Sequence, residues 1–386
     1  MTMPRFSTKA LALSLALSVS GLSSQAFAFD ATNLLERYTA LAETQGQKFA
    51  YESVDASSDG FTVKGATWTF EGMAPIKSET LTFDGVSEAS DGSVKIDTIT
   101  VDSIVSGENE VVVTFDKAVM EGLRIPKEGE TRSLEQMAFY NSFLATGGQV
   151  TNQGNVVAKL GDMSITLSDF SPTAPLTFAM TLADSMIDVS MAPDPQFKQT
   201  LEALGYGTNF TVSTNMQGVW NTETGIIDVS KHDYSIADVG TISMPMKIGG
   251  YSSENVLAMQ KSVGAGGSDE AAMQQLSNVT IHNLAISFKD DSVTKRALEM
   301  ASKQMQQPPE QLAAGAPLMI GMGMAQLQMP EFTQMVQAAV GKFLQNPGTL
   351  SVTAAPEKPT PVMELVGGAA NPKGLVDMLN VKVTAE

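Results

Sequence analysis

Cysteine is missing from this chain of 386 residues, which also contains only 2 histidines and 2 tryptophans. The absence of thiols excludes disulfides and Cys–His catalytic pairs, so the stability of the fold must come from buried apolar area. Basic residues are scarce as well, with 24 Lys and Arg against 42 Asp and Glu and a net charge of −18. Because an acidic protein repels nucleic acid and anionic lipid headgroups, we expect neither as a direct electrostatic partner.

Long apolar runs are confined to the N-terminus. Arg5 and Lys9 precede a short apolar stretch at residues 10–19, and Ala-Phe-Ala ends at Ala28. This pattern predicts an export signal over residues 1–28, cleaved after Ala28, and the run is too short to serve as a membrane anchor. We therefore expect a mature chain without a transmembrane segment, located in a bacterial periplasm or secreted.

Alternation of apolar and polar residues over 209–250 is the clearest structural signal. It predicts strands with one buried face around a tight turn at residues 220–225, with a middle strand at residues 226–236. Similar patterns predict further strands at 61–70, 79–86, 93–104, 110–119, 156–167, 176–191 and 278–289. Within 93–104 the apolar positions fall out of step, which predicts a β-bulge near Asp97.

Apolar residues at helical spacing alternate with these strand regions. They predict helices at 30–47, 133–146, 253–276, 292–307, 309–328 and 330–345, and a final strand at 379–384 that returns to the sheet. The predicted fold class is α+β, mainly antiparallel β-meanders with interspersed helices. We expect a β-rich region at 29–290 and a C-terminal helical, Met-rich region at 291–386.

Catalytic signatures are sparse. His232 and His282 each fall inside a predicted strand, and no Gly-x-Ser-x-Gly elbow supplies a nucleophile. Ser292 and Lys295 match the Ser-x-x-Lys pattern of penicillin-recognising enzymes, but the accompanying motifs are missing, and Asp291 or Ser292 is better explained as a helix cap. We expect no enzymatic activity, no bound metal and no cofactor.

Methionine is unusually frequent, with 23 residues. The predicted C-terminal helices carry Met319, Met322, Met324, Met329 and Met335. Thioethers suit an adaptable apolar surface for a lipid or a partner, a Cu(I) site, or an irregular helical core. We expect these five residues to form the ligand-binding surface, with the other two interpretations left open.

Three stretches carry a resemblance to known proteins, namely residues 220–225, 238–242 and 343–353. In them the chain resembles uncharacterised exported proteins of alphaproteobacteria. In its many short strands behind an export signal it is more distantly similar to envelope proteins of the AsmA/TamB and YdgA types. The latter resemblance implies a role in envelope maintenance or lipid movement along a β-lined groove, although the membrane anchor usual in that group is absent.

The expected function is that of a non-enzymatic periplasmic envelope protein that binds a hydrophobic, lipid-like ligand or a protein partner. A structural or assembly factor of the envelope without a small ligand is the main alternative. A Met-based copper-handling protein is a third possibility, since Met319, Met322 and Met324 lie close together in the sequence.

Overall fold

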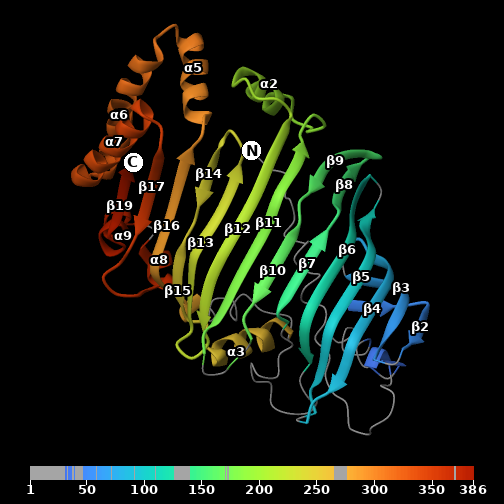
Figure 1. The fold of residues 1–386 in the computed structure, drawn as a ribbon. Coiled ribbons are helices and arrows are strands. Elements are labelled where there is room, and N and C mark those ends of the chain that lie inside the picture. The colour runs from blue at the N-terminus through green and yellow to red at the C-terminus, as the bar shows by residue number, and fades with distance from the viewer. Residues whose placement is uncertain are drawn as a thin grey trace. The chain divides into compact units, whose positions relative to one another are not determined.

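The computed structural model shows a fold dominated by antiparallel strands, with 49% of the residues in strands and 28% in helices (Figure 1), which confirms the predicted α+β class. The chain divides into two compact units, residues 1–172 and 173–386. The structure describes residues 31, 32, 34–36, 39, 47–57, 59–70, 72–90, 92–108, 110–125, 140–169, 171, 174–264, 276–368 and 371–386. The predicted export signal lies outside the described residues.

The first unit is a meander in which most strands pair with their neighbours in the chain. Its strands are β1 (Gln47–Ala50), β2 (Ser53–Ala56), β3 (Gly60–Phe70), β4 (Ile76–Glu88), β5 (Val94–Glu108), β6 (Val111–Ile125), β7 (Ser142–Thr146), β8 (Gly148–Asn152), β9 (Asn155–Leu160) and β10 (Met163–Leu167). β3, β4, β5 and β6 pair in sequence order. β1 and β2 both flank β3, and β7 and β8 both flank β6. β9 pairs with β8, and β10 pairs with β7.

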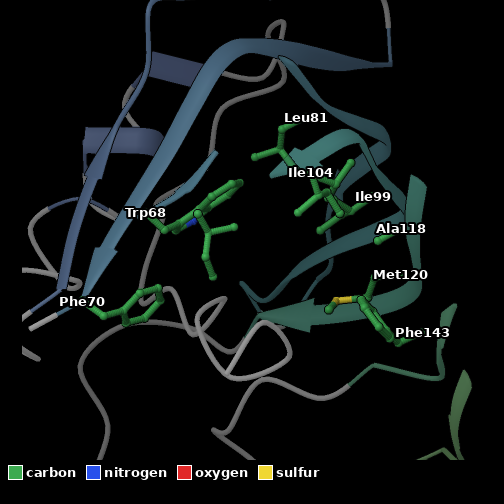
Figure 2. A pocket seen from close by; sticks show the side chains of 10 residues that line it. Trp68, Phe70, Leu81, Ile99, Ile104, Ala118, Met120 and Phe143 are labelled. Atoms are coloured by element: carbon green, nitrogen blue, oxygen red, sulfur yellow. The ribbon is translucent and has the colours of Figure 1, made fainter. Parts of the chain in front are cut away.

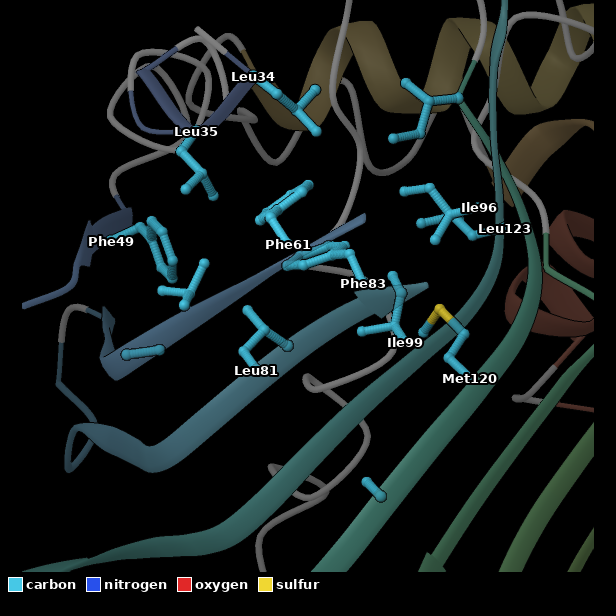
Figure 3. Packing of buried hydrophobic residues seen from close by; sticks show 14 of the residues in the cluster. Leu34, Leu35, Phe49, Phe61, Leu81, Phe83, Ile96, Ile99, Met120 and Leu123 are labelled. Atoms are coloured by element: carbon cyan, nitrogen blue, oxygen red, sulfur yellow. The ribbon is translucent and has the colours of Figure 1, made fainter. Parts of the chain in front are cut away.

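One face of this meander carries the main apolar core (Figure 3). Phe61 and Phe83 stack across β3 and β4 with ring centroids 4.3 Å apart. Leu34 and Leu35, from the N-terminal helical residues, are buried in the same cluster. Each fully buried side chain of this size stabilises the fold by roughly 1.5–3 kcal/mol, so this face holds the unit together.

The second unit is a further antiparallel meander. Its strands are β11 (Leu176–Asp188), β12 (Asn209–Asn221), β13 (Ile226–Ile236), β14 (Gly240–Ser243), β15 (Met246–Gly249), β16 (Thr280–Asp290), β17 (Thr349–Ala354), β18 (Thr360–Pro361) and β19 (Val381–Ala385). β13 coincides with the predicted middle strand. The alternating stretch after it divides into β14 and β15 on either side of Pro245, which has no N–H to continue the ladder.

The two faces of the second sheet differ sharply in polarity. One cross-strand row consists of paired polar residues, and the adjacent row on the opposite face is largely apolar. The polar row is Thr181, Asn215, Asp233, Ser243, Ser287, Ser351 and Thr384, and the adjacent row is Leu182, Thr214, Tyr234, Ile242, Phe288, Leu350 and Ala385. This is the period-two alternation that the sequence predicted, but the expected burial is wrong for part of the apolar row, where Tyr234 and Ile242 are each 42% exposed.

The helices of the second unit fall between and beside its strands. They are α2 (Pro195–Ala203), α3 (Ser253–Gly264), α5 (Val293–Met305), α6 (Pro309–Met324), the short 3₁₀ helix η3 (Ala325–Leu327), α7 (Pro330–Gln345), α8 (Val362–Gly368) and α9 (Pro372–Met378). The three helices predicted after residue 290 are thus confirmed as α5, α6 and α7. Among the described residues, no helix combines the length and apolar character that crossing a membrane requires.

α7 packs against the edge of the sheet where β19 lies. Phe343 is buried on α7 with its ring 6.3 Å from that of Phe288. The Lys342 ammonium donates a hydrogen bond to the Ala385 carbonyl at 2.7 Å, and the Val383 N–H donates to the Met335 sulfur at 3.1 Å. The helix therefore covers a row of backbone groups that an exposed edge strand would offer to another chain.

The helix predicted at 133–146 is wrong for its last residues. Residues 133–139 lie outside the described residues, while Ser142–Thr146 form β7. Phe143 and Ala145 alternate toward the core, and pairing with β6 and β10 satisfies the backbone. Tertiary pairing therefore overrides the local helical pattern.

Candidate functional site

Two transverse irregularities, which we call creases, cross the sheet of the first unit. In each crease, residues with positive φ alternate across the strands with acidic or amide residues. The first crease contains Gly65, Glu79, Ser103, Asp116 and Gly147, and the second contains Gly85, Asp97, Gly122 and Asn141. The positive-φ members are the glycines and Ser103, which has a φ of 54°.

At a crease, the side chains of a strand change the face of the sheet to which they point, while the register between neighbouring strands stays the same. In β5, Ile96 and Ile99 are each 1% exposed and both face the core, although they are three residues apart. The pairs Asp84–Thr98 and Val86–Ile96 nevertheless keep the same offset between β4 and β5. The predicted bulge at Asp97 is wrong, because no residue is inserted in β5 relative to β4. The neighbouring strands instead change their pleat at the same place.

A pocket opens on the core face beside the first crease (Figure 2). Its cavity volume is about 40 Å³, and the wider space of about 550 Å³ between the side chains includes open solvent. Five strands contribute its lining, which consists of Trp68, Phe70, Ile76, Leu81, Ile99, Val101, Ile104, Ala118, Met120 and Phe143. Every residue in this lining is apolar, so the pocket suits an uncharged, apolar group.

The crease explains both the position and the character of the pocket. Val101 and Ile104 flank Ser103, and both point to the core face because the pleat shifts between them. The carboxylate side chains of Glu79 and Asp116 belong to exposed residues of the crease. Apolar side chains thus gather on one side of the sheet while acidic ones remain in solvent on the other.

Ser78 is the polar exception on the core face of β4. It is 4% exposed, and its hydroxyl has no hydrogen-bond partner among the described residues. Its neighbours along this face are Ile76 and Leu81, which both line the pocket, and it pairs with Ala66 on β3. A buried hydroxyl without a partner costs about 1–3 kcal/mol, so its presence here needs an explanation.

Two surface carboxylates have electrostatic partners away from the pocket. Asp55 lies 2.6 Å from Lys64, and this hydrogen bond and the attraction between the charges raise the pKa of the Lys64 ammonium. The Ser190 N–H donates to the Asp188 carboxylate at 2.8 Å and lowers the pKa of that group. Both shifts belong to solvent-exposed groups and therefore describe local surface stability.

The five predicted methionines lie in the second unit and do not form one surface. Met319 and Met322 are 67% and 57% exposed on α6, whereas Met329, just before α7, is 6% exposed. Met324 is half-buried, and Met335 is half-buried with its sulfur accepting the N–H of Val383. Only the α6 pair presents thioethers openly to solvent within this set.

The Ser-x-x-Lys residue Ser292 takes part in a structural cluster. Its hydroxyl donates to the Asp238 carbonyl, lies 2.8 Å from the Tyr206 hydroxyl, and accepts from Arg296 Nε at 3.1 Å. It makes no side-chain cap of α5. Instead, the Asp290 carboxylate accepts the N–H of the first-turn residue Thr294. Ser292 therefore occupies the N-cap position of α5, as predicted, but its hydroxyl makes no capping hydrogen bond because it is engaged by other elements.

The two histidines also have local partners. His232 Nε2 lies 2.7 Å from the Tyr234 hydroxyl, and His282 Nε2 lies 3.3 Å from the Thr280 hydroxyl. Among the described residues, no group of three or more His, Asp or Glu side chains is arranged to hold a metal ion.

The site that sequence reasoning missed is the pocket. Its one visible signal was the out-of-step apolar pattern at 93–104.

Comparison with known proteins adds a partial match. No curated protein matches the chain. Residues 233–386 match the model of a family described as "Uncharacterized protein". The matched part begins within β13 and lies wholly in the second unit, so it includes α5, α6 and α7 but none of the pocket residues. Over residues 233–386, the chain is therefore similar to a family whose description names no activity.

Proposed function

We propose that this protein is a non-enzymatic periplasmic envelope protein that binds a hydrophobic, lipid-like ligand in the pocket of the first unit. The observation that carries the proposal is a pocket at a crease whose lining is entirely apolar. Binding there would remove apolar ligand surface from water, and the acidic side chains of the crease would stay solvated. The periplasmic location rests on the export signal expected at residues 1–28.

The pocket predicts a chain-length dependence for ligand affinity. Each methylene removed from water contributes about 0.8 kcal/mol, which corresponds to roughly a fourfold gain in affinity. Affinity for a homologous series of alkyl chains should rise by about this factor per methylene and then level off once the pocket is full. A flat series would contradict binding by burial.

Trp68 supplies the reporter for this experiment, since it lines the pocket and the other tryptophan, Trp220, lies in the second unit. In a Trp220→Phe protein, bromoalkanes of increasing length should quench the fluorescence of Trp68. Native mass spectrometry with solvent extraction of protein from a periplasm should show a bound lipid in parallel. Absence of both quenching and extractable lipid would overturn the proposal.

A variant whose side chain fills the pocket distinguishes ligand binding there from binding to other apolar surfaces. Ala118 is 1% exposed and lines the pocket, so Ala118→Leu should occupy the space and abolish quenching. Because the space is already empty, this change should avoid most of the 1–3 kcal/mol that overpacking a filled core costs. Val119→Leu is the matched control, since Val119 is the next residue and points to the opposite face.

A protein partner is the second candidate, supported by the open surface of α6. Leu318, Met319 and Met322 are 66%, 67% and 57% exposed there, and such neighbouring apolar side chains suit contact with another protein. Cross-linking from Leu318 and Met322 positions in intact cells would test it. Recovery of the protein without a cross-linked partner would contradict this candidate and leave pocket binding unaffected.

A further inference from the structure

Resting on the proposed function, we propose that the pocket receives the end of an unbranched alkyl chain, while the polar head of the ligand stays in solvent. The ligand class is then a lipid with linear chains, whatever its head. Ligands whose apolar part ends in a ring or a branch, as in sterols and isoprenoids, are excluded. Three features carry the inference, namely the size of the cavity, the stiffness of its floor and the chemistry of its lining.

The cavity is small for a lipid-binding site. Its volume is about 40 Å³, and the wider space of about 550 Å³ is shared with solvent. An engineered apolar cavity of roughly 150 Å³ takes up one benzene molecule. A six-membered ring therefore exceeds the enclosed space, whereas the last carbons of a linear chain, which is narrower than a ring, fit it.

The lining consists of a buried floor and a more exposed rim. Ile99 and Ile104 of the floor are 1% and 4% exposed. Trp68 and Phe70 are half-buried, and Figure 2 shows their rings across the space from Phe143. We therefore place the entrance beside these two rings, so that a ligand passes them before it reaches the floor.

The floor does not widen easily to admit a larger group. Ile76, Ile99 and Ile104 have β-branched side chains, whose χ1 angle is restricted. Close-packed interiors respond to added volume with strain rather than with expansion. Met120 is the exception, because its unbranched thioether side chain adapts its shape. It is 4% exposed and lines the pocket, so shortening this side chain would enlarge the space.

The chemistry of the lining decides which end of a lipid enters. None of the lining residues supplies a hydroxyl, a side-chain amide or a charge. A charged or strongly polar head buried here would lose its hydration without adequate replacement. Entry by the chain end avoids this cost, since the head then remains outside the rim.

The position of a bromine atom tests the direction of entry in the Trp220→Phe protein. Dodecanoate brominated at its chain end should quench the fluorescence of Trp68. Dodecanoate brominated beside the carboxylate should displace this probe but leave most of the fluorescence. Dodecyl phosphocholine, which has the same chain and the head of a phospholipid, should displace the probe within about threefold of unbrominated dodecanoate.

The shape of the chain end is tested by competition between two acids with the same number of carbons. ω-Cyclohexylhexanoate should displace the quenching probe at least about tenfold more weakly than dodecanoate, because two methylenes left in water lose roughly fourfold each. Met120→Ala should bring the two acids to within about threefold of each other by admitting the ring. Leu123→Ala is the matched control, since Leu123 is 2% exposed on the same strand but does not line the pocket, so the preference should persist.

The outcomes separate the inference from the proposed function. Strong quenching by the bromine beside the carboxylate, equal competition by the ring-ended acid, or a larger difference between the two heads would each overturn entry by a linear chain end while leaving pocket binding intact. Failure of both brominated probes to quench Trp68 would overturn the proposed function itself. If circular dichroism shows that a variant of Met120 or Leu123 does not fold, the comparisons in the Trp220→Phe protein decide the inference.

Discussion

Substituting Gly147 by alanine tests the physical basis of the first crease. Gly147 has a φ of +68° between β7 and β8, where it lies beside Asp116 of β6. A Cβ at this position would lie 2.1 Å from Asp116 Oδ2 and 2.6 Å from Asp116 Cβ. Rotation of the Asp116 side chain would move the oxygen but not its own Cβ, so the backbone of one strand would have to shift.

The expected magnitude has two parts. The left-handed conformation costs a residue with a Cβ about 1–2 kcal/mol. Crowding against a fixed neighbour adds roughly 1–3 kcal/mol. Gly154→Ala is a matched control, since Gly154 has a φ of +78° in the β8–β9 turn with no atom within 4 Å of the added Cβ. In Gly154→Ala only the cost of the left-handed conformation applies.

Urea unfolding followed by Trp68 fluorescence in the Trp220→Phe protein measures the stability of the first unit. Gly147→Ala should lower the free energy of unfolding by about 1–3 kcal/mol more than Gly154→Ala does. Equal losses would refute the close approach at the crease. A second contrast comes from Gly65, whose added Cβ would meet Glu52 Cγ and Cδ at 2.5 Å. Because those atoms belong to a flexible side chain, Glu52→Ala should remove the crowding part of the loss in Gly65→Ala and leave the conformational part, whereas Asp116→Ala should not relieve the crowding in Gly147→Ala.

Three further predictions concern the second unit. Phe343→Ala removes a buried ring from the contact of α7 with Phe288. It should lower the free energy of unfolding by about 3–5 kcal/mol in a urea titration. A loss below about 1 kcal/mol would contradict this packing. Met329→Ala should cost about 2–5 kcal/mol, whereas Met322→Ala should stay within about 0.5 kcal/mol in the same titration, and similar losses would contradict their different burial. The hydrogen bond from the Ser190 N–H lowers the pKa of Asp188 in the folded state. The charged carboxylate therefore stabilises the fold at pH values above its unfolded pKa, and this stabilisation is lost as the pH falls through the lowered folded pKa. Asp188→Asn should therefore reduce the difference in melting temperature between about pH 7 and about pH 3, and an unchanged difference would argue against this linkage.

Local alternation was sufficient to predict much of the second unit. The middle strand at 226–236 and the helices α5, α6 and α7 follow from patterns of period two and period 3.6 read within single segments. Pro245 also carried a usable signal, because a proline inside an alternating run predicts an interruption of the ladder. Patterns within single segments therefore predicted these elements, whereas the break at Pro245 was not predicted from the alternation over 242–248.

The creases could not be predicted in the same way. Val94 and Ile96 are out of step with Ile99 and Val101, and a bulge in one strand is the usual explanation for such a pattern. The actual cause lies in neighbouring strands, where Gly85 and Gly122 have positive φ at the same transverse line. Because the shift is shared between strands, it becomes visible only when the register is known.

The candidate site shows the same dependence on tertiary structure. The frequency of methionine drew attention to residues 319–335, but burial separates exposed Met322 from buried Met329. The pocket instead gathers ten residues from five strands, none of which forms a motif in the sequence.

The meander topology has a consequence for how the chain acquires its structure. Within each unit most strands pair with the strand just before or after them, so many contacts close short loops and incur little loop-closure entropy. The pairing of β16 with β17 is different, since α5, α6 and α7 intervene between them. Proteins rich in local contacts fold faster than those that join distant segments. We therefore expect the hairpins of both units to form first, and the β16–β17 ladder, with β19 beyond it, to close the second sheet in a slower step.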